Sequence, residues 1–174
     1  NVLGAGTLKT NSSTSFSLNN NALNFSGGNA AAGGVLETNG MATLDGMTFD
    51  EKSTIKLNAN TFLSSSSPVT VKTVEMGTYS MALANATTDL TISGNLTINP
   101  SGNPQQGGID TGAADLTLNG VLSVQKGFIG STGGKITFGA GANGSSFAGN
   151  SENSGLSLTD TSLVLNTNLS TSYL

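Results

Sequence analysis

Apolar residues two positions apart recur along nearly the whole chain, and this alternation is its strongest pattern. Alternation with period two is typical of a half-buried β-strand. The steps between successive pairs are 26, 27, 21, 26, 20 and 20 residues, about one coil of a β-solenoid, in which each coil buries its apolar face by stacking on the next. The pairs predict about seven coils: Phe16/Leu18, Ala42/Leu44, Val69/Val71, Leu90/Ile92, Leu116/Leu118, Ile136/Phe138 and Leu156/Leu158.

A second apolar pair follows the first in most repeats, which predicts at least two strands per coil. These pairs are Leu23/Phe25, Met47/Phe49, Val74/Met76, Leu96/Ile98, Leu122/Val124 and Leu163/Leu165. Turn-forming residues that accept left-handed backbone geometry or bond their own backbone lie between the two pairs, as in Asn19–Asn21, Asp45-Gly46, Ser93–Asn95, Asn119-Gly120 and Thr159–Thr161. We expect them to stack as equivalent corners, with Asn and Thr bonding from coil to coil.

An antiparallel β-sandwich or jelly roll is the alternative, because Asn-Gly between alternating strands is a strong hairpin signal. In a two-residue hairpin at Asn119-Gly120, Leu118 would oppose Val121, which would send Leu122 to the opposite face from Leu118. Only Leu44–Met47 suits a tight hairpin. A corner that directs both apolar pairs into one lumen explains more of the chain, so we favour an all-β, right-handed parallel β-helix.

Three stretches interrupt the repeat. Residues 50–63 carry extra apolar side chains and predict a third strand with a bulging loop. Residues 100–108 contain two prolines and predict a surface loop, and Gly139–Gly155 a third flexible region. None is long enough to separate domains, so residues 1–174 form one predicted solenoid domain or fragment, with the apolar residues 1–8 as an edge-pairing or capping strand.

The composition of the chain excludes some classes of binding partner. Only 9% of the 174 residues are charged, and the net charge is −4, which argues against nucleic acid or an anionic membrane surface. No apolar run reaches the roughly 18 residues of a membrane span. The chain has no cysteine and starts without a signal-like segment, which we interpret as a processed form or a fragment.

No catalytic constellation is evident, and we predict no enzyme activity, metal or cofactor. Histidine and cysteine, the commonest general base and the thiol nucleophile, are absent. Asp45, Asp50 and Glu51 are weak candidates for a carboxylate or calcium site. Asp89 and Asp115 occupy equivalent positions just before a strand, where turn acceptors are expected more often than calcium ligands. Gly130–Lys135 superficially suggests a phosphate loop without the Walker spacing.

The repeats at 88–98 and 114–124 have a Leu-x-Leu-x-Gly-x-Leu-x-Val pattern. With the Asn, Gly, Ser and Thr composition and the missing cysteine, they resemble the passenger domains of bacterial autotransporters and related large β-helical adhesins. Phe25–Asn29 and Phe147–Asn150 are loosely similar to repeats of chlamydial polymorphic outer-membrane proteins. The wider resemblance implies secretion through an outer membrane, display on the cell surface, and adhesion, aggregation or toxin delivery.

Three functional hypotheses follow. The first is an extracellular adhesive rod whose partner is a host-cell surface, a glycan or other copies of the chain. The second is a subunit of an extracellular filament, a possible homopolymer that assembles by strand complementation through residues 1–8. The third, a carbohydrate-active β-helix enzyme, is the least favoured because histidine and arginine are missing.

Overall fold

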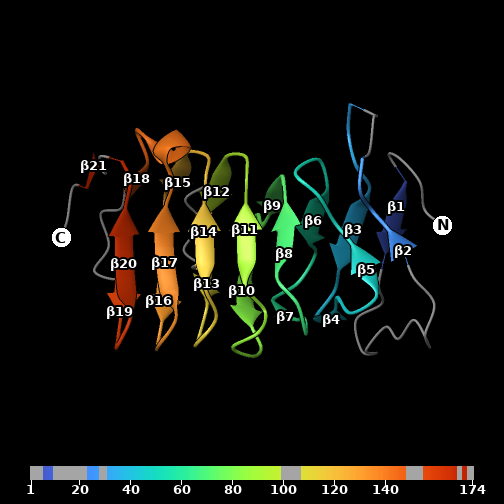
Figure 1. Ribbon diagram of the computed structural model, residues 1–174, viewed down its shortest axis with the longest axis horizontal. Helices are drawn as coiled ribbons and strands as arrows, with labels where there is room; N and C mark the ends of the chain where they lie inside the picture. Colours follow the sequence, from blue (N-terminus) through green and yellow to red (C-terminus); the bar gives the residue numbers. More distant parts are fainter. Residues whose placement is uncertain are drawn as a thin grey trace.

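The chain folds into a β-solenoid, as Figure 1 shows in a computed structural model that describes residues 6–9, 23–27, 31–98, 107–147, 155–167 and 170–171. Every strand pairing in these ranges is parallel, which confirms the solenoid and shows that the antiparallel sandwich is wrong. Leu44–Met47 is a turn between strands of different sheets and not a hairpin; the Met47 N–H donates to the Leu44 carbonyl at 2.9 Å.

The strands follow one another in a repeating order over three faces of the rod. The first face is a six-stranded sheet: β4 (Met41–Thr43), β7 (Thr61–Ser64), β10 (Ser80–Leu83), β13 (Gly107–Asp110), β16 (Gly127–Ser131) and β19 (Gly155–Leu158). Its six strands are separated by five coil-to-coil steps, so this continuous sheet spans about five turns of the solenoid.

The second and third faces are each divided into two sheets. The second face holds β2 (Leu23–Asn24) and β5 (Met47–Thr48), then β8 (Val69–Val71), β11 (Leu90–Ile92), β14 (Leu116–Leu118), β17 (Lys135–Phe138) and β20 (Ser162–Leu165). The third holds β1 (Thr7–Lys9), β3 (Val35–Thr38), β6 (Thr54–Leu57) and β9 (Thr73–Glu75), then β12 (Leu96–Ile98), β15 (Leu122–Val124), β18 (Ser146–Phe147) and β21 (Ser170–Thr171).

The seven apolar pairs of the sequence do not form a single column, and the predicted count of about seven coils differs slightly from the five turns of the continuous sheet. The pairs at Val69, Leu90, Leu116 and Ile136 are neighbours in register on the second face, as predicted. Ala42 and Leu156 belong to the first face, where they pair with Leu63 and Ile129. Leu163, assigned to the second set of pairs, continues the column after Ile136. Phe16 and Leu18 lie outside the described residues.

Three strands per coil replace the predicted minimum of two. The third strand gives little apolar signal in the sequence at β13 and β16. Glycine occupies half or nearly half of the positions in these two strands, and each strand has a single buried isoleucine. Gly107 and Gly108, predicted as part of a loop, lie in β13; residues 100–106 lie outside the described residues. The sequence predicted one strand and a bulging loop for residues 50–63. The structure instead places the whole of β6 and the start of β7 there. Within Gly139–Gly155, a 3₁₀ turn (η1, Ala140–Ala142) precedes β18.

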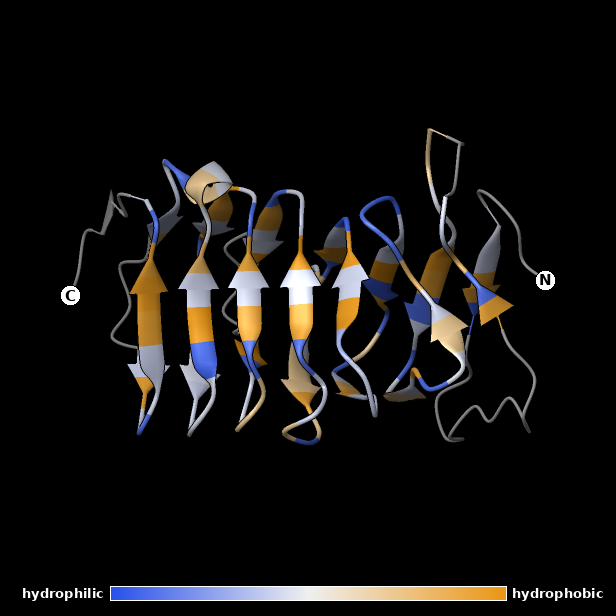
Figure 2. Ribbon diagram, in the orientation of Figure 1, coloured by the Kyte–Doolittle hydropathy of each residue, from blue (hydrophilic) through white to orange (hydrophobic). Residues whose placement is uncertain are grey.

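The core is a set of apolar columns inside the rod. Figure 2 shows apolar bands that continue from strand to strand across the second face. In β14, Leu116 and Leu118 point inward and are at most 1% exposed, whereas Thr117 between them is partly exposed. Each fully buried side chain of this kind contributes roughly 1.5–3 kcal/mol, and each rests on its counterparts in the neighbouring coils.

The corners explain two roles of glycine. Gly46 has a φ of 77°, the left-handed geometry expected for this turn. Gly120 has a different role: a Cβ there would lie 2.3 Å from the carbonyl carbon and oxygen of Gly94 one coil away. The two corners therefore stack in direct backbone contact, and any side chain at Gly120 would push the coils apart.

Leu118→Asp should unfold several coils together, because an unpaired carboxylate would be buried against Ile92 and Phe138 in the same column. The loss should exceed the roughly 2–5 kcal/mol typical of truncating a buried leucine. Circular dichroism melting curves measure it. Thr117→Asp, one residue away and directed outward, is the matched control and should melt close to the parent protein. Unchanged melting of Leu118→Asp would contradict the lumen assignment.

Candidate functional site

The three acidic candidates near β5 do not form a joint site. The Asp50 carboxylate accepts the Gly27 and Lys52 backbone N–H groups at 2.8 and 2.9 Å and so shapes the turn that leads to β6. Asp45 Oδ1 accepts the Ser66 N–H at 2.6 Å, and Glu51 is exposed. Among the described residues there is no group of three or more Asp, Glu, His or Cys side chains that could hold a metal ion.

Asp89 and Asp115 are bonded to the coil that follows each of them. Asp89 Oδ1 accepts the Asp115 backbone N–H at 2.9 Å, and Asp115 Oδ1 accepts the Lys135 N–H at 2.8 Å. The second Asp115 oxygen lies 3.2 Å from Lys135 Nζ. Both carboxylates therefore act as hydrogen-bond acceptors before a strand, but the N–H group that each accepts belongs to the following coil and not to its own turn. Asn60 and Asn95 do the same for the Ser80 and Val121 N–H groups, both at 2.9 Å.

The glycine-rich segment 130–135 forms no phosphate loop. Gly130 and Ser131 belong to β16, residues 132–134 form the corner, and Lys135 begins β17. Gly134 lies so close to the preceding coil that a Cβ would be 2.0 Å from the Ala114 carbonyl oxygen. The glycine serves coil stacking, as the corner interpretation predicted.

Charged side chains line up on one part of the third face. Lys9, Glu37, Lys56 and Glu75 are neighbours in register on β1, β3, β6 and β9. The Lys9 ammonium, 2.9 Å from Glu37 Oε2, is the main cause that lowers the pKa of Glu37; burial opposes this, and Asn58 and Lys56 add to it. Opposite charges alternate along this row, and the Glu37 carboxylate pairs with Lys9 and Lys56 in the coils on either side.

Threonine occupies the centre of four consecutive strands on the second face. Thr70, Thr91, Thr117 and Thr137 are register partners on β8, β11, β14 and β17, each partly exposed between two buried apolar residues. Strands in a sheet lie about 4.8 Å apart, so the hydroxyls repeat at that spacing along the rod. We call these residues the threonine file. Sequence reasoning missed it, although a threonine stands inside each of the four apolar pairs.

A cleft interrupts the second face at the end of the threonine file, where β5 and β8 are not hydrogen-bonded to each other. Figure 1 shows β5 tilted away from β8. The cleft has a volume of about 150 Å³. Its lining combines hydroxyls, a carboxylate and apolar side chains: Leu44, Asp45, Gly46, Met47, Phe49, Ser65–Thr70. Pro68 and the four serines before it were the available sequence signal, since proline has no N–H to donate.

The described residues include no helix that is long and apolar enough to cross a membrane. Comparisons with family models, curated proteins and solved structures found no match to this chain.

Asp115→Ala should lower the melting temperature, because the Lys135 N–H loses its acceptor and Lys135 Nζ its ion-pair partner. We expect about 1 kcal/mol for the lost hydrogen bond, which is roughly 2–4 °C in a chain of this size. Asp115→Asn, which keeps an oxygen at the corner, should recover part of the loss. Calcium and EDTA should leave the melting of all three proteins unchanged. A calcium-dependent rise that disappears in Asp115→Asn would instead establish a cation site at Asp89 and Asp115.

Proposed function

We propose that the chain is a secreted, surface-displayed structural and adhesive β-rod that mediates attachment or aggregation without catalysis. The threonine file is the observation that carries the proposal. A rigid parallel sheet presents four hydroxyl groups in register, with their backbone fixed by the buried residues on either side. Such preorganised donors and acceptors lose little entropy when they contact a partner.

The composition supports the same proposal. A low fraction of charge leaves hydroxyls and amides as the main surface chemistry, which suits glycans, host-cell surfaces or other copies of the chain more than nucleic acid. The resemblance of the repeats at 88–98 and 114–124 to autotransporter passengers supports a place outside the cell, on a bacterial surface. The absence of histidine and cysteine supports a role other than catalysis.

Adhesion is tested with beads to which the protein is coupled. The beads are washed under flow over three surfaces, which are cultured epithelial cells, immobilised neutral polysaccharide and immobilised albumin, and the retained beads are counted. We expect retention above that of albumin-coated beads on cells or polysaccharide. The Thr91→Val/Thr117→Val variant removes two hydroxyls of the file while keeping side-chain shape, and should lower retention about tenfold, the effect of about 1.4 kcal/mol.

The matched control is Thr97→Val/Ser123→Ala, which removes two register-paired hydroxyls from the third face. Its beads should be retained like those of the parent protein. If parent beads adhere to none of the surfaces, or only as well as albumin-coated beads, the adhesive role is wrong. An equal loss of bead retention in the two double variants would show that the hydroxyls of the second face contribute no more to attachment than those of the third.

The second candidate function is that of a filament subunit, and the far end of the second face favours it. Leu163, Val164 and Leu165 of β20 are 39%, 36% and 49% exposed. Leu163 and Leu165 continue the core columns of Ile136 and Phe138, and no described strand pairs with β20 on its other side. Unpaired strand edges of this kind accept a strand from another molecule.

Electron microscopy across a concentration series tests the filament hypothesis. Ordered filaments should form in the parent protein and disappear when residues 1–8 are deleted, with a folded monomer left behind. Thr7 and Leu8 lie in β1, which among the described strands pairs with β3 alone, whereas residues 1–5 lie outside the described residues. Short monodisperse rods at all concentrations, or filaments that survive the deletion, would contradict strand complementation through this segment.

A further inference from the structure

The cleft arises because two coils that stay paired on the other faces separate on the second. The same coils are joined by β4–β7 on the first face and β6–β9 on the third. On the second face, the Met47 N–H at the start of β5 donates to the Leu44 carbonyl within its own turn, and Pro68 just before β8 has no N–H to donate. Neither group is available to pair β5 with β8. At the corner before the cleft the two coils are still joined: the Leu44 N–H donates to the Ser64 carbonyl at 2.8 Å, and the Ser66 N–H donates to Asp45 Oδ1 at 2.6 Å. The opening is therefore built into the local sequence.

Asp45 presents a charged acceptor at the mouth of this cleft. Its Oδ1 is fixed by the Ser66 N–H, which lowers the pKa of the carboxyl, so the group is ionised at neutral pH. The Ser66 side chain also hydrogen-bonds to this carboxyl and lowers its pKa further. The neighbouring Ser66 and Ser67 side chains are exposed. A carboxylate accepts strong hydrogen bonds from neutral hydroxyl donors.

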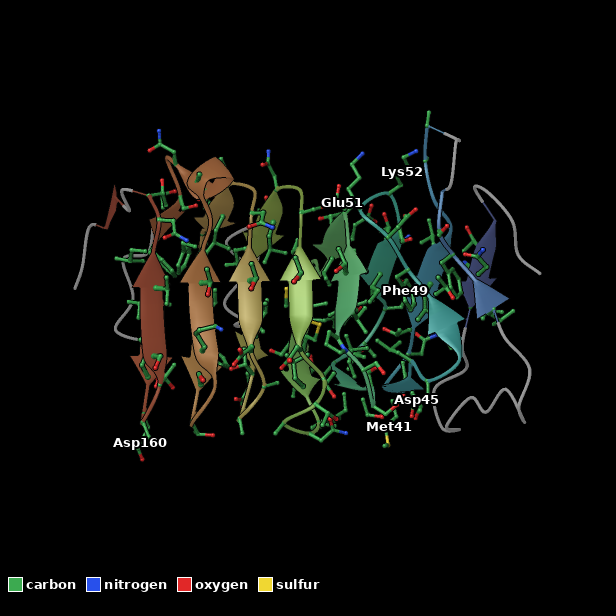
Figure 3. The ribbon with its side chains drawn as sticks, viewed as in Figure 1. Met41, Asp45, Phe49, Glu51, Lys52 and Asp160 are labelled. Atoms are coloured by element: carbon green, nitrogen blue, oxygen red, sulfur yellow. The ribbon has the colours of Figure 1, made fainter. Side chains whose placement is uncertain are left out.

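Phe49 adds a partly exposed aromatic ring to a lining that is mostly polar. Its ring stacks on the buried ring of Phe25, with centroids 5.0 Å apart and planes 4° from parallel. The stack covers one side of the Phe49 ring, and the remaining surface lines the cleft together with Met47. Figure 3 shows Phe49 on the same side of the rod as Asp45, next to β5. A mostly polar lining with one aromatic ring and a fixed carboxylate suits a ligand that carries many hydroxyl groups and a small apolar face.

A sugar ring has this chemistry, because its C–H groups form an apolar face and its hydroxyls lie around the rim. The cleft of about 150 Å³ holds the equivalent of roughly five water molecules. It is smaller than the pockets of roughly 300–1,000 Å³ that enclose whole ligands. It therefore suits one ring of a longer molecule. Thr70 lines the cleft and is also the first member of the threonine file, so such a molecule could continue along the second face.

We propose that the cleft between β5 and β8 binds one neutral sugar ring of a glycan chain, with Asp45 accepting from ring hydroxyls and Phe49 packing on the apolar face. The proposal rests on the adhesive function above and names its ligand class. An anionic sugar is disfavoured by the Asp45 charge and the net charge of −4.

The four methionines give a direct readout by NMR of the ¹³C-methyl-labelled protein. Met47 lines the cleft, Met76 and Met81 are each 1% exposed in the core, and Met41 is 60% exposed on the first face. The probes are maltose, cellobiose, lactose and chitobiose, with an uncharged extended tetrapeptide for comparison. We expect at least one disaccharide to shift the Met47 methyl saturably, with a Kd on the order of 1 mM, while the Met41 methyl stays in place.

Asp45→Asn, which keeps an oxygen for the Ser66 N–H, and Phe49→Leu should each weaken this binding about tenfold. Glu51→Gln removes a nearby exposed carboxylate that does not line the cleft and should bind like the parent protein. Unchanged Met76 and Met81 methyl signals show in each sample that the coil stack is intact.

The proposal is overturned if no disaccharide shifts the Met47 methyl signal, or if Asp45→Asn binds the disaccharide as well as the parent protein does. It is also overturned if the tetrapeptide alone shifts this signal, which would indicate addition of a strand to the sheet. The bead assay separates this failure from that of the adhesive function. Beads carrying Asp45→Asn that adhere like the parent would leave the rod adhesive and remove the cleft from attachment. Parent beads that adhere to nothing would reject adhesion itself.

Discussion

Stacking of one coil on the next in register is the interaction on which the rest of the structure depends. A coil of 20 to 27 residues on the second face contributes two inward apolar side chains per strand, too few to form a core alone. Leu90, Leu116 and Ile136 become buried because each covers the next. Since successive side chains in a strand alternate between faces, a shift of one residue would turn the column outward. Register therefore fixes both the core and the surface.

Corner side chains bonded to the next coil support this register from outside the core. Asp89, Asn95 and Asp115 each accept a backbone N–H from the coil that follows. Each bond contributes only about 1 kcal/mol, but it is available in one register alone. The apolar columns supply most of the stability, and the corner bonds add directional specificity that non-directional apolar packing lacks.

The fold could be predicted from the sequence because its signal is periodic, and the errors lie where the period is hidden. Leu90/Ile92 and Leu116/Leu118 show their partnership in spacing and in pattern. Ala42 was assigned to the wrong face because coil lengths vary, so spacing alone does not distinguish one face from another. Strand β13 was mistaken in part for a loop because Gly107 and Gly108 lack side chains, and the Phe128 ring occupies the space that a Cβ at Gly108 would need. The threonine file was visible in the sequence. For the cleft the sequence offered Pro68 and the serines before it, which indicate an interruption but do not show which strands stay unpaired.

The two interruptions in the sheets have a mechanical consequence. The second face is interrupted between β5 and β8 and the third between β9 and β12, so both flank the coil made of β7, β8 and β9. Only the first face runs unbroken through this coil, from β4 to β19. Hydrogen bonds in a solenoid run along the rod axis, and tension between its ends pulls directly on them. Each of the two junctions that this coil makes with its neighbours therefore rests on strand pairing over two faces instead of three. Under tension one junction would open on the second face and the other on the third, while the unbroken first face would act as a hinge, so the rod would bend before it breaks.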